Sequence, residues 1–382
     1  MFKFQIQKQS KKTLARQGII ETSHGKVQTP VFMPCATVGA VKGISPEELK
    51  NLGFELILAN TYHLYLRPGD KFIKKFGGLH QFMNWPNSIL TDSGGYQVFS
   101  LGAGFRASNK QKSLVEQRKD GVIFRSHLDG SKHKFTPEKV IDIQRNLGSD
   151  IMMVLDECTE YPASKERAQK SLSLTHLWAK KANDYWQKKK TQKQARLQCS
   201  ERSDGGQALF GIIQGSVYQD LRRESAKFIA SLPFDGIAVG GVSVGETKLQ
   251  MHQVMQWLGP MLPKDKPHYL MGVGEPEDII EAVRWGFDLF DSVLPTRLGR
   301  HGTVWVTGDW RSFQKFDLRR AKFSQDKNVL MKNCQCPACC QGFSRAYLSH
   351  LTREKEMLGM RLLSLHNLFF IQELLRRLCQ EI

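Results

Sequence analysis

Eight short apolar segments alternate with stretches of helical period through most of this 382-residue chain, and this alternation constrains its fold more than any other feature. Apolar runs of about four to eight residues joined by helix-length connections favour parallel strands with crossover helices over an all-α or all-β domain. Eight such units match a closed (β/α)8 barrel. The segments are 30–36, 56–60, 88–92, 150–156, 208–215, 236–241, 268–274 and 289–295. We therefore expect an α/β, TIM-like barrel, with a doubly wound open sheet as the alternative.

Further elements are predicted around this barrel. Helical periodicity indicates outer helices over 136–148, 164–184, 218–232 and 276–286. Residues 101–136 lack that period and contain a hairpin pattern with Asp129 and Gly130 at its turn, so we expect an insertion after the third strand. The alternating segments 2–9 and 19–29 predict a two-stranded cap over one end of the barrel.

Three cysteines and one histidine near the end of the sequence form its densest set of metal ligands. Cys334, Cys336 and Cys339 lie close together, and His366 follows inside an apolar run. Such soft ligands suit a closed tetrahedral site, so we predict one structural Zn2+ per chain. The alternatives are buried free cysteines beside a core histidine, or disulfides. Cys340 is the alternative to Cys339 as ligand, although the C-x-C-x-x-C spacing favours Cys339.

The same features suggest a division into two parts and a compartment. We expect a barrel over 1–295, and a zinc-binding subdomain with C-terminal helices over 296–382. The first residues contain no apolar core of a signal peptide, and the chain has no run of about eighteen apolar residues, so neither export nor membrane spanning is expected. The remaining cysteines are scattered singly, which suits the reducing cytoplasm. They are Cys35, Cys158, Cys199 and Cys379.

Charge points to a polyanionic partner. Lys and Arg number 55 against 37 Asp and Glu, a formal net charge of +18, and such an excess attracts nucleic acid. The stretch 178–196 is interpreted as mostly a solvated helix face. Basic residues interleaved with aromatic ones suit phosphates and unstacked bases, and they crowd the segment that leads into the zinc cluster. They are Arg297, Arg300, Arg311, Lys315, Arg319, Arg320 and Lys322, beside Trp305, Trp310 and Phe313.

Polar residues end several of the predicted strands, where a barrel of this kind carries its reacting groups. Asp92, Asp156, Gln214 and Asp291 occupy such positions. Paired carboxylates can cleave a glycosidic or N-glycosidic bond by nucleophilic attack and proton transfer. A carboxylate with an amide can also bind a purine edge, and Gly240-Gly241 would let the backbone approach a flat ligand. The structural alternatives are that Asp92 and Asp156 only cap helices or shape turns, and that Cys158 only fills the core.

Several motifs resemble those of the tRNA-guanine transglycosylases, in the same order and over nearly the whole chain. They are TDSGGYQVFSL (91–101), DECT (156–159), GIIQGS (211–216), AVGGVSVGE (238–246), PHYLMGVG (267–274), FDSVLPTRLGRHG (290–302), CQCPAC (334–339) and SRAYL (344–348). The resemblance implies a βα barrel with an inserted zinc subdomain and a homodimer. It also implies exchange of the wobble guanine in the anticodon loop of transfer RNA for a 7-deazaguanine base, by double displacement through a covalent ribosyl ester.

The resemblance also implies a role for particular residues. Asp291 would be the nucleophile and Asp92 the general acid/base. The purine would contact Ser93, Tyr96, Asp156, Cys158, Gln214, Gly241, Val242 and Met271. Arg297 and Arg300 would contact the anticodon, and the zinc ligands would be Cys334, Cys336, Cys339 and His366.

Some positions depart from the family pattern, and other functions compete. Glu275 stands where many bacterial members have lysine, which affects one anticodon contact. Cys158 and Val244 resemble the bacterial type, which takes 7-aminomethyl-7-deazaguanine, whereas Ser243 resembles the eukaryotic pattern of enzymes that take queuine. The rivals are a non-catalytic RNA-binding partner subunit, which would lack Asp291, and a barrel glycoside hydrolase, which would carry tryptophans at its mouth.

Overall fold

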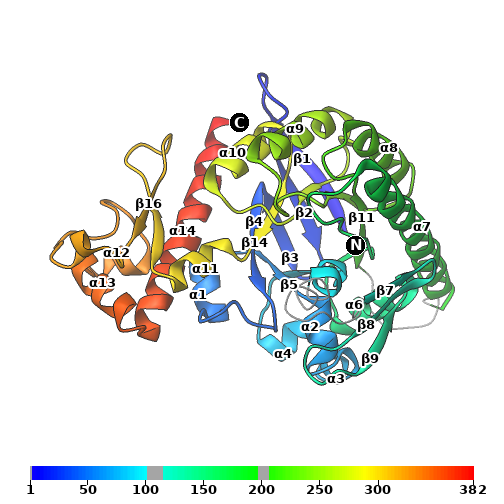
Figure 1. The fold of residues 1–382 in the computed structure, drawn as a ribbon, viewed down its shortest axis with the longest axis horizontal. Helices are drawn as coiled ribbons and strands as arrows, with labels where there is room; N and C mark the ends of the chain where they lie inside the picture. The colour runs from blue at the N-terminus through cyan, green and yellow to red at the C-terminus, as the bar shows by residue number, and fades with distance from the viewer. Residues whose placement is uncertain (1, 101–114, 197–205) are drawn as a thin grey trace.

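A computed structural model describes residues 2–100, 115–196 and 206–382 and contains a closed barrel of eight parallel strands (Figure 1). The strands follow one another around the barrel in chain order, and each is hydrogen-bonded to the next. They are β4 (Val31–Ala36), β5 (Leu56–Ala59), β6 (Ser88–Thr91), β10 (Ile151–Met153), β11 (Ala208–Ile213), β12 (Gly236–Val239), β13 (His268–Leu270) and β14 (Leu289–Ser292). Every predicted apolar segment contains one barrel strand. The predicted barrel is confirmed and the open sheet is excluded.

Helices lie outside the barrel (Figure 1). The predicted ones are α6 (Pro137–Leu147), α7 (Lys165–Arg196), α8 (Gln219–Ala230) and α10 (Pro276–Arg284). Those the sequence prediction did not include are α1 (Pro46–Asn51), α2 (Thr61–Leu66), α3 (Asp70–Lys75), α4 (Leu79–Met83), α9 (Lys248–Leu258) and the 3₁₀ turn η1 (Gly259–Met261). Local chemistry sets their first residues: the Thr247 hydroxyl accepts from the Gln250 amide, and the Gln250 side chain accepts from the Thr247 amide, a capping box that begins α9.

The N-terminal cap has three strands, not the predicted two. β1 (Lys3–Gln9), β2 (Arg16–Thr22) and β3 (Gly25–Thr29) form an antiparallel sheet. The segment taken as one strand reverses direction at Ser23 and His24, because Gly25 adopts a φ of +123° that favours glycine.

The insertion after the third barrel strand also forms an antiparallel sheet, of β7 (Val115–Arg118), β8 (Gly121–Arg125) and β9 (Lys132–Phe135). The predicted hairpin is confirmed: it joins β8 to β9, with Gly130 at a φ of +73° in its turn. The earlier part of the predicted insertion, 101–114, lies outside the described residues.

The chain after β14 builds a projection beside the barrel (Figure 1). It contains α11 (Leu294–Arg300), β15 (Thr303–Val306), β16 (Gln314–Asp317), the 3₁₀ turn η2 (Ala321–Phe323), α12 (Pro337–Cys340), α13 (Arg345–Arg353) and α14 (Met357–Glu381). α14 packs against α11, α12 and α13 of the projection and against β4 of the barrel. Its buried residues therefore join the two parts through one apolar interface.

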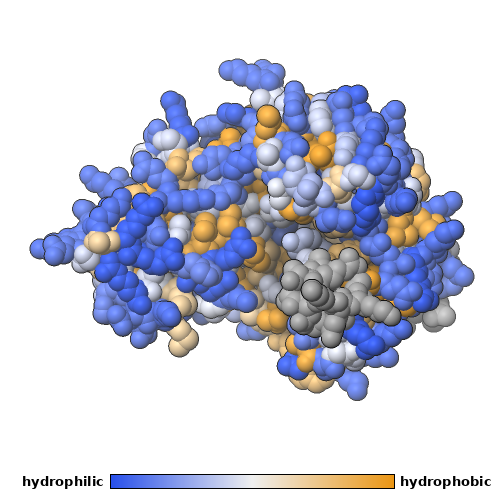
Figure 2. Space-filling model, viewed as in Figure 1, coloured by the Kyte–Doolittle hydropathy of each residue, from blue (hydrophilic) through white to orange (hydrophobic). Residues whose placement is uncertain are grey.

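The stretch 178–196, interpreted as a solvated helix face, belongs to α7 but is more buried than expected. Trp178 is fully buried and Trp186 nearly so, because the helix packs its aromatic side against the barrel layer. Hydrophilic residues nevertheless cover most of the visible molecular face (Figure 2). Within the described ranges, no helix is both long and apolar enough to cross a membrane.

Candidate active site

A cavity of about 300 Å³ opens at the carboxyl ends of the barrel strands. It is the end at which barrels of this kind place their reacting groups. The predicted residues that line it are Asp92, Ser93, Tyr96, Asp156, Cys158, Gln214, Gly241, Val242, Met271, Asp291 and Arg297. The fold therefore gathers residues that are up to about two hundred positions apart in the sequence into one site.

Asp291, in β14, is held by donors from the neighbouring strand. The Tyr269 hydroxyl donates to Asp291 Oδ1 at 2.6 Å, and the Gly272 amide donates to the same oxygen at 2.7 Å. The Cys35 thiol lies 3.5 Å from Oδ2. Burial raises the pKa of Asp291, whereas these three donors lower it. Oδ2 therefore remains the more available oxygen for attack on a ligand in the cavity.

Asp92 follows β6 and is also fixed on several sides. The Thr61 amide donates to Asp92 Oδ1 at 2.8 Å, while the Gln97 and Asn60 amides donate to Oδ2. Burial raises the pKa of Asp92 to about 6, with a further small increase from the charge of Asp291 and opposition from the three donors. A carboxyl with such a pKa exchanges protons readily near neutral pH.

Asp156 and Gln214 form a hydrogen-bonding pair on the cavity wall. Gln214 Nε2 donates to Asp156 Oδ2 at 2.7 Å, and the Ser93 hydroxyl donates to Oδ1 at 3.2 Å. Burial raises the pKa of Asp156 to about 6. Gln214 Oε1 is buried and has no hydrogen-bond partner among the described residues. A buried acceptor without a partner is costly, so this oxygen indicates a ligand that brings an N–H group.

The turn after β12 gives the cavity a backbone wall. Gly241 has a φ of +62°, and a Cβ there would approach Gln214 Oε1 to 2.2 Å, so glycine is needed. Arg222, fully buried on α8, donates to the carbonyls of Gly240 at 2.7 Å and Gly241 at 2.8 Å. Both carbonyls thus point to Arg222, and these hydrogen bonds orient the Gly240–Gly241 turn.

Two hydrophobic side chains provide apolar surface at the cavity. Tyr96 is 53% exposed although it lines the cavity, and Met271 follows β13 and is partly buried. Cys158 is also partly buried at the lining, and burial raises its pKa to about 12, so it is a neutral thiol there. An exposed aromatic ring beside buried polar groups suits a flat ligand with a polar edge.

The two predicted arginines of α11 differ in position. Arg297 is exposed and lines the cavity, but Arg300 does not line it and is half-buried. Arg300 Nη1 has no partner among the described residues, and burial lowers the pKa of this side chain, with a further contribution from Arg297. Glu275, one of the departures from the family pattern, forms a 2.5 Å ion pair with Lys315 of β16. The two opposite charges of this pair offset each other.

The four predicted zinc ligands come together and are buried. His366 Nδ1 lies 3.2 Å from Cys336 Sγ and 3.8 Å from the sulfurs of Cys334 and Cys339. The Nε2–H of His366 donates to the Trp305 carbonyl at 2.8 Å, which leaves Nδ1 free to bind metal. The cluster fits a structural zinc site.

Cys340, the alternative ligand, is exposed and directs its thiol to the Cys334 carbonyl at 3.7 Å. The geometry therefore favours Cys339 at the cluster. Bound there, Zn2+ would tie the loop around α12 to α14.

Sequence reasoning missed five residues of the active site: Cys35, Asn60, Gln97, Tyr269 and Arg222. Asn60 ended a predicted strand, so its position was an available signal. The orientations of Tyr269 and Cys35 depend on the strand register, and the contact of Arg222 depends on how α8 packs on the barrel. Neither strand register nor helix packing can be predicted from the local sequence pattern.

A closed βα barrel with three carboxylates at its mouth, a polar cavity wall and a separate Cys3His cluster is the architecture of a base- or sugar-transferring enzyme with a structural metal site. Comparison with known proteins identifies the family. The family model described as queuine tRNA-ribosyltransferase matches residues 10–382. The chain belongs to this family, whose members are pentosyltransferases.

Curated relatives extend the similarity to nearly full length, and each is named queuine tRNA-ribosyltransferase. The relative from Caldanaerobacter subterraneus subsp. tengcongensis is 50% identical over 380 residues, covering 100% of this chain and 93% of the relative. That from Oleidesulfovibrio alaskensis is 49% identical over 362 residues, covering 95% and 88%. That from Desulforudis audaxviator is 47% identical over 380 residues, covering 99% and 94%.

Proposed function

We propose that this chain exchanges the wobble guanine of transfer RNA for 7-aminomethyl-7-deazaguanine, through a ribosyl ester on Asp291. The observation that carries the proposal is the partly buried Asp291 carboxylate, oriented through Oδ1 by Tyr269 and Gly272, in one cavity with Asp92. An exchange that proceeds by two displacements needs a fixed nucleophile and a separate proton carrier. The Cys3His cluster lies outside the cavity, so the Zn2+ that these four residues would hold has a structural role.

In the first displacement, Asp291 Oδ2 attacks the ribose C1′. A C1′–O bond forms, the C1′–N9 bond to guanine breaks, and Asp92 donates a proton to the departing base. In the second, Asp92 removes a proton from the incoming base, whose ring nitrogen displaces Asp291 from C1′. Two inversions restore the original configuration. The pKa of about 6 at Asp92 suits both proton transfers.

Guanine and the 7-deazaguanine base have the same hydrogen-bonding groups on their pyrimidine ring, so the same residues would recognise both. The carboxylate of Asp156 would accept two N–H bonds, and the unpaired Gln214 Oε1 or its amide would pair with the remaining edge groups. Ser93, Gly241 and Val242 would complete this wall. Tyr96 and Met271 would stack on the two faces of the base and offset the cost of extruding a nucleotide, roughly a few kcal/mol.

The basic surface would hold the rest of the transfer RNA, beginning with its anticodon loop. Arg297 lines the cavity and is exposed, which suits a flanking phosphate or base. The Glu275–Lys315 pair removes one cationic contact that many bacterial members have. We infer that the barrel 1–295 carries the chemistry and that 296–382 positions the RNA.

We also infer a homodimer in the cytoplasm. Phe72 on α3, Phe76 directly after α3 and Phe82 on α4 are exposed and contact one another. Apolar surface gathered in this way suits burial between copies. Sedimentation equilibrium would test the dimer, and a monomer at micromolar concentration would contradict it.

Incubation of the protein with transfer RNA and each candidate base tests the exchange. After digestion to nucleosides, mass analysis should detect the 7-aminomethyl-7-deazaguanine nucleoside. Incorporation of queuine instead would assign the chain to the queuine-accepting type, for which Ser243 is the supporting residue. Binding of transfer RNA without incorporation of any base would instead support a non-catalytic partner subunit.

A further inference from the structure

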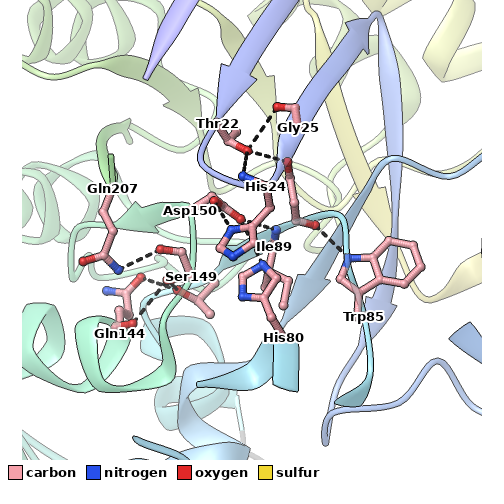
Figure 3. A network of polar contacts seen from close by, with 12 residues as sticks. Thr22, His24, Gly25, His80, Trp85, Ile89, Gln144, Ser149, Asp150 and Gln207 are labelled. Carbon is pink, nitrogen blue, oxygen red and sulfur yellow. Dashed lines mark hydrogen bonds and ion pairs between the residues drawn. The ribbon is translucent and has the colours of Figure 1, made fainter. Parts of the chain in front are cut away.

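A second cluster of metal-binding side chains lies at the other end of the barrel from the cavity. His24 lies in the turn between β2 and β3, His80 lies on α4, and Asp150 directly precedes β10 (Figure 3). Asp150 stands before this strand and Asp156 after it, so the two carboxylates mark opposite ends of the barrel. The mechanism above uses none of the three residues.

Both imidazoles direct a nitrogen at the same carboxylate. His24 Nδ1 lies 2.7 Å from Asp150 Oδ1, and His80 Nε2 lies 3.2 Å from Oδ2. The two rings stack with centroids 3.5 Å apart and planes 13° from parallel. The Ile89 amide donates to Asp150 Oδ2 at 2.9 Å and fixes the carboxylate from the barrel side. One ligand atom from each residue lies within 4.8 Å of the others.

This arrangement is close to that of an ion-binding site. A first-row divalent ion bonds imidazole nitrogen and carboxylate oxygen at roughly 2.0–2.2 Å, so ring tilts would bring all three donors onto one ion. Two imidazoles and one carboxylate are a donor set that suits Zn2+, Co2+ or Ni2+ rather than Mg2+ or Ca2+. The side chain of His24 is 36% exposed against 10% for His80 and 2% for Asp150, so an ion from solvent can reach the cluster on the side of His24.

We propose that His24 Nδ1, His80 Nε2 and the Asp150 carboxylate bind a divalent transition-metal ion, distinct from the ion of the Cys3His cluster. The ion replaces the protons that these nitrogens share with the carboxylate. It joins the turn of the N-terminal cap, α4 and the start of β10. Groups at the amino end of a βα barrel contribute to stability rather than to chemistry, so the ion acts as a clamp.

Metal stoichiometry tests the proposal. The zinc-loaded protein, dialysed against micromolar Co2+ at pH 8, should hold two metal ions per chain when zinc and cobalt are counted together by mass spectrometry. The melting temperature should rise with added Co2+. His24→Gln should reduce the number of bound metal ions to one per chain and remove the rise in melting temperature. This substitution suits the test because His24 lies in a partly exposed turn.

A matched control is His252→Gln. His252 forms an ion pair with Asp278 at 3.0 Å, and no second histidine joins this pair. Replacing His252 should therefore leave two ions bound. His80→Gln gives a second test at a more buried ligand, and unchanged melting without added metal would show that each variant folds. The proposal is overturned if the natural chain holds one ion, or if both His24→Gln and His80→Gln still hold two.

Discussion

The Tyr269 hydroxyl donates a 2.6 Å hydrogen bond to Oδ1 of Asp291, and both side chains line the cavity. Burial raises the pKa of Tyr269 well above its ordinary value, and the neighbouring Asp291 charge raises it further, so the phenol remains a donor. The consequence is that Oδ1 of Asp291 has two close donors, whereas Oδ2 has only the Cys35 thiol at 3.5 Å.

Asp291→Asn should lower the rate at which radiolabelled guanine is exchanged into transfer RNA by about a thousandfold or more, because an amide cannot form the ribosyl ester. The fold and zinc content should be unchanged, as checked by circular dichroism and metal analysis. Denaturing gels of the natural enzyme during turnover should show protein joined to RNA. Exchange that persists in the variant would disprove the assignment of the nucleophile.

Tyr269→Phe should lower the rate of exchange by about 10- to 100-fold, since a hydrogen bond to a charged group contributes about 1.5–3 kcal/mol. The effect should fall on kcat more than on KM for transfer RNA, because Tyr269 contacts the nucleophile rather than the RNA. Steady-state kinetics would separate the two. A change in KM alone would show that the residue only shapes the cavity.

Asp156→Asn should make the free enzyme more stable near pH 8 while weakening base binding. Burial raises the pKa of Asp156 from 3.8 to about 6, so the folded state binds this proton more tightly than the unfolded state. The natural chain therefore gains stability as pH falls from about 6 to about 4, by at most about 3 kcal/mol. Melting curves should show an advantage for the variant at pH 8 that disappears near pH 4. An advantage that is the same at both pH values would contradict the raised pKa.

Cys336→Ser should remove zinc and lower the melting temperature, because the buried Cys336 Sγ is one of the four ligand atoms of the cluster and lies 3.2 Å from His366 Nδ1. Cys340→Ser is the matched control and should keep one zinc per chain, since this thiol is exposed and turned away. Zinc content and thermal melting measure both effects. Loss of zinc from the control variant would reverse the choice between Cys339 and Cys340.

Arg297→Ala should weaken transfer RNA binding and reduce the slope of log affinity against log salt by about one, if it contacts a phosphate. Arg284→Ala is a suitable control, because Arg284 pairs with Glu281 on α10 and does not line the cavity. Salt titrations by filter binding would compare them. Equal slopes for the two variants would place the phosphate contact elsewhere.

Local pattern was sufficient for the barrel and for much of the site. Each apolar segment became a strand because a parallel strand buried on both faces needs a continuous apolar run. Asp92, Asp156 and Gln214 could be placed at the mouth because they follow such runs directly, and β14 carries Asp291 near its end. The zinc ligands were identifiable from their chemistry and spacing.

Contacts between distant segments were not predictable in this way. The two strands after β1 were taken as one because the reversal at Gly25 depends on a single backbone angle. Trp178 and Trp186 were taken as part of a solvated face because lysines surround them in the sequence, whereas packing on the barrel buries their rings.

The amino-acid sequence by itself determined the order of strands, the polar residues at their ends and the metal-binding set, since these follow from periodicity and side-chain chemistry within short segments. Only the tertiary structure decided that Tyr269 orients Asp291, that Arg222 supports the Gly240–Gly241 turn, and that His24 and His80 meet at Asp150. Such relationships depend on strand register and helix packing, which bring together residues that no local pattern connects.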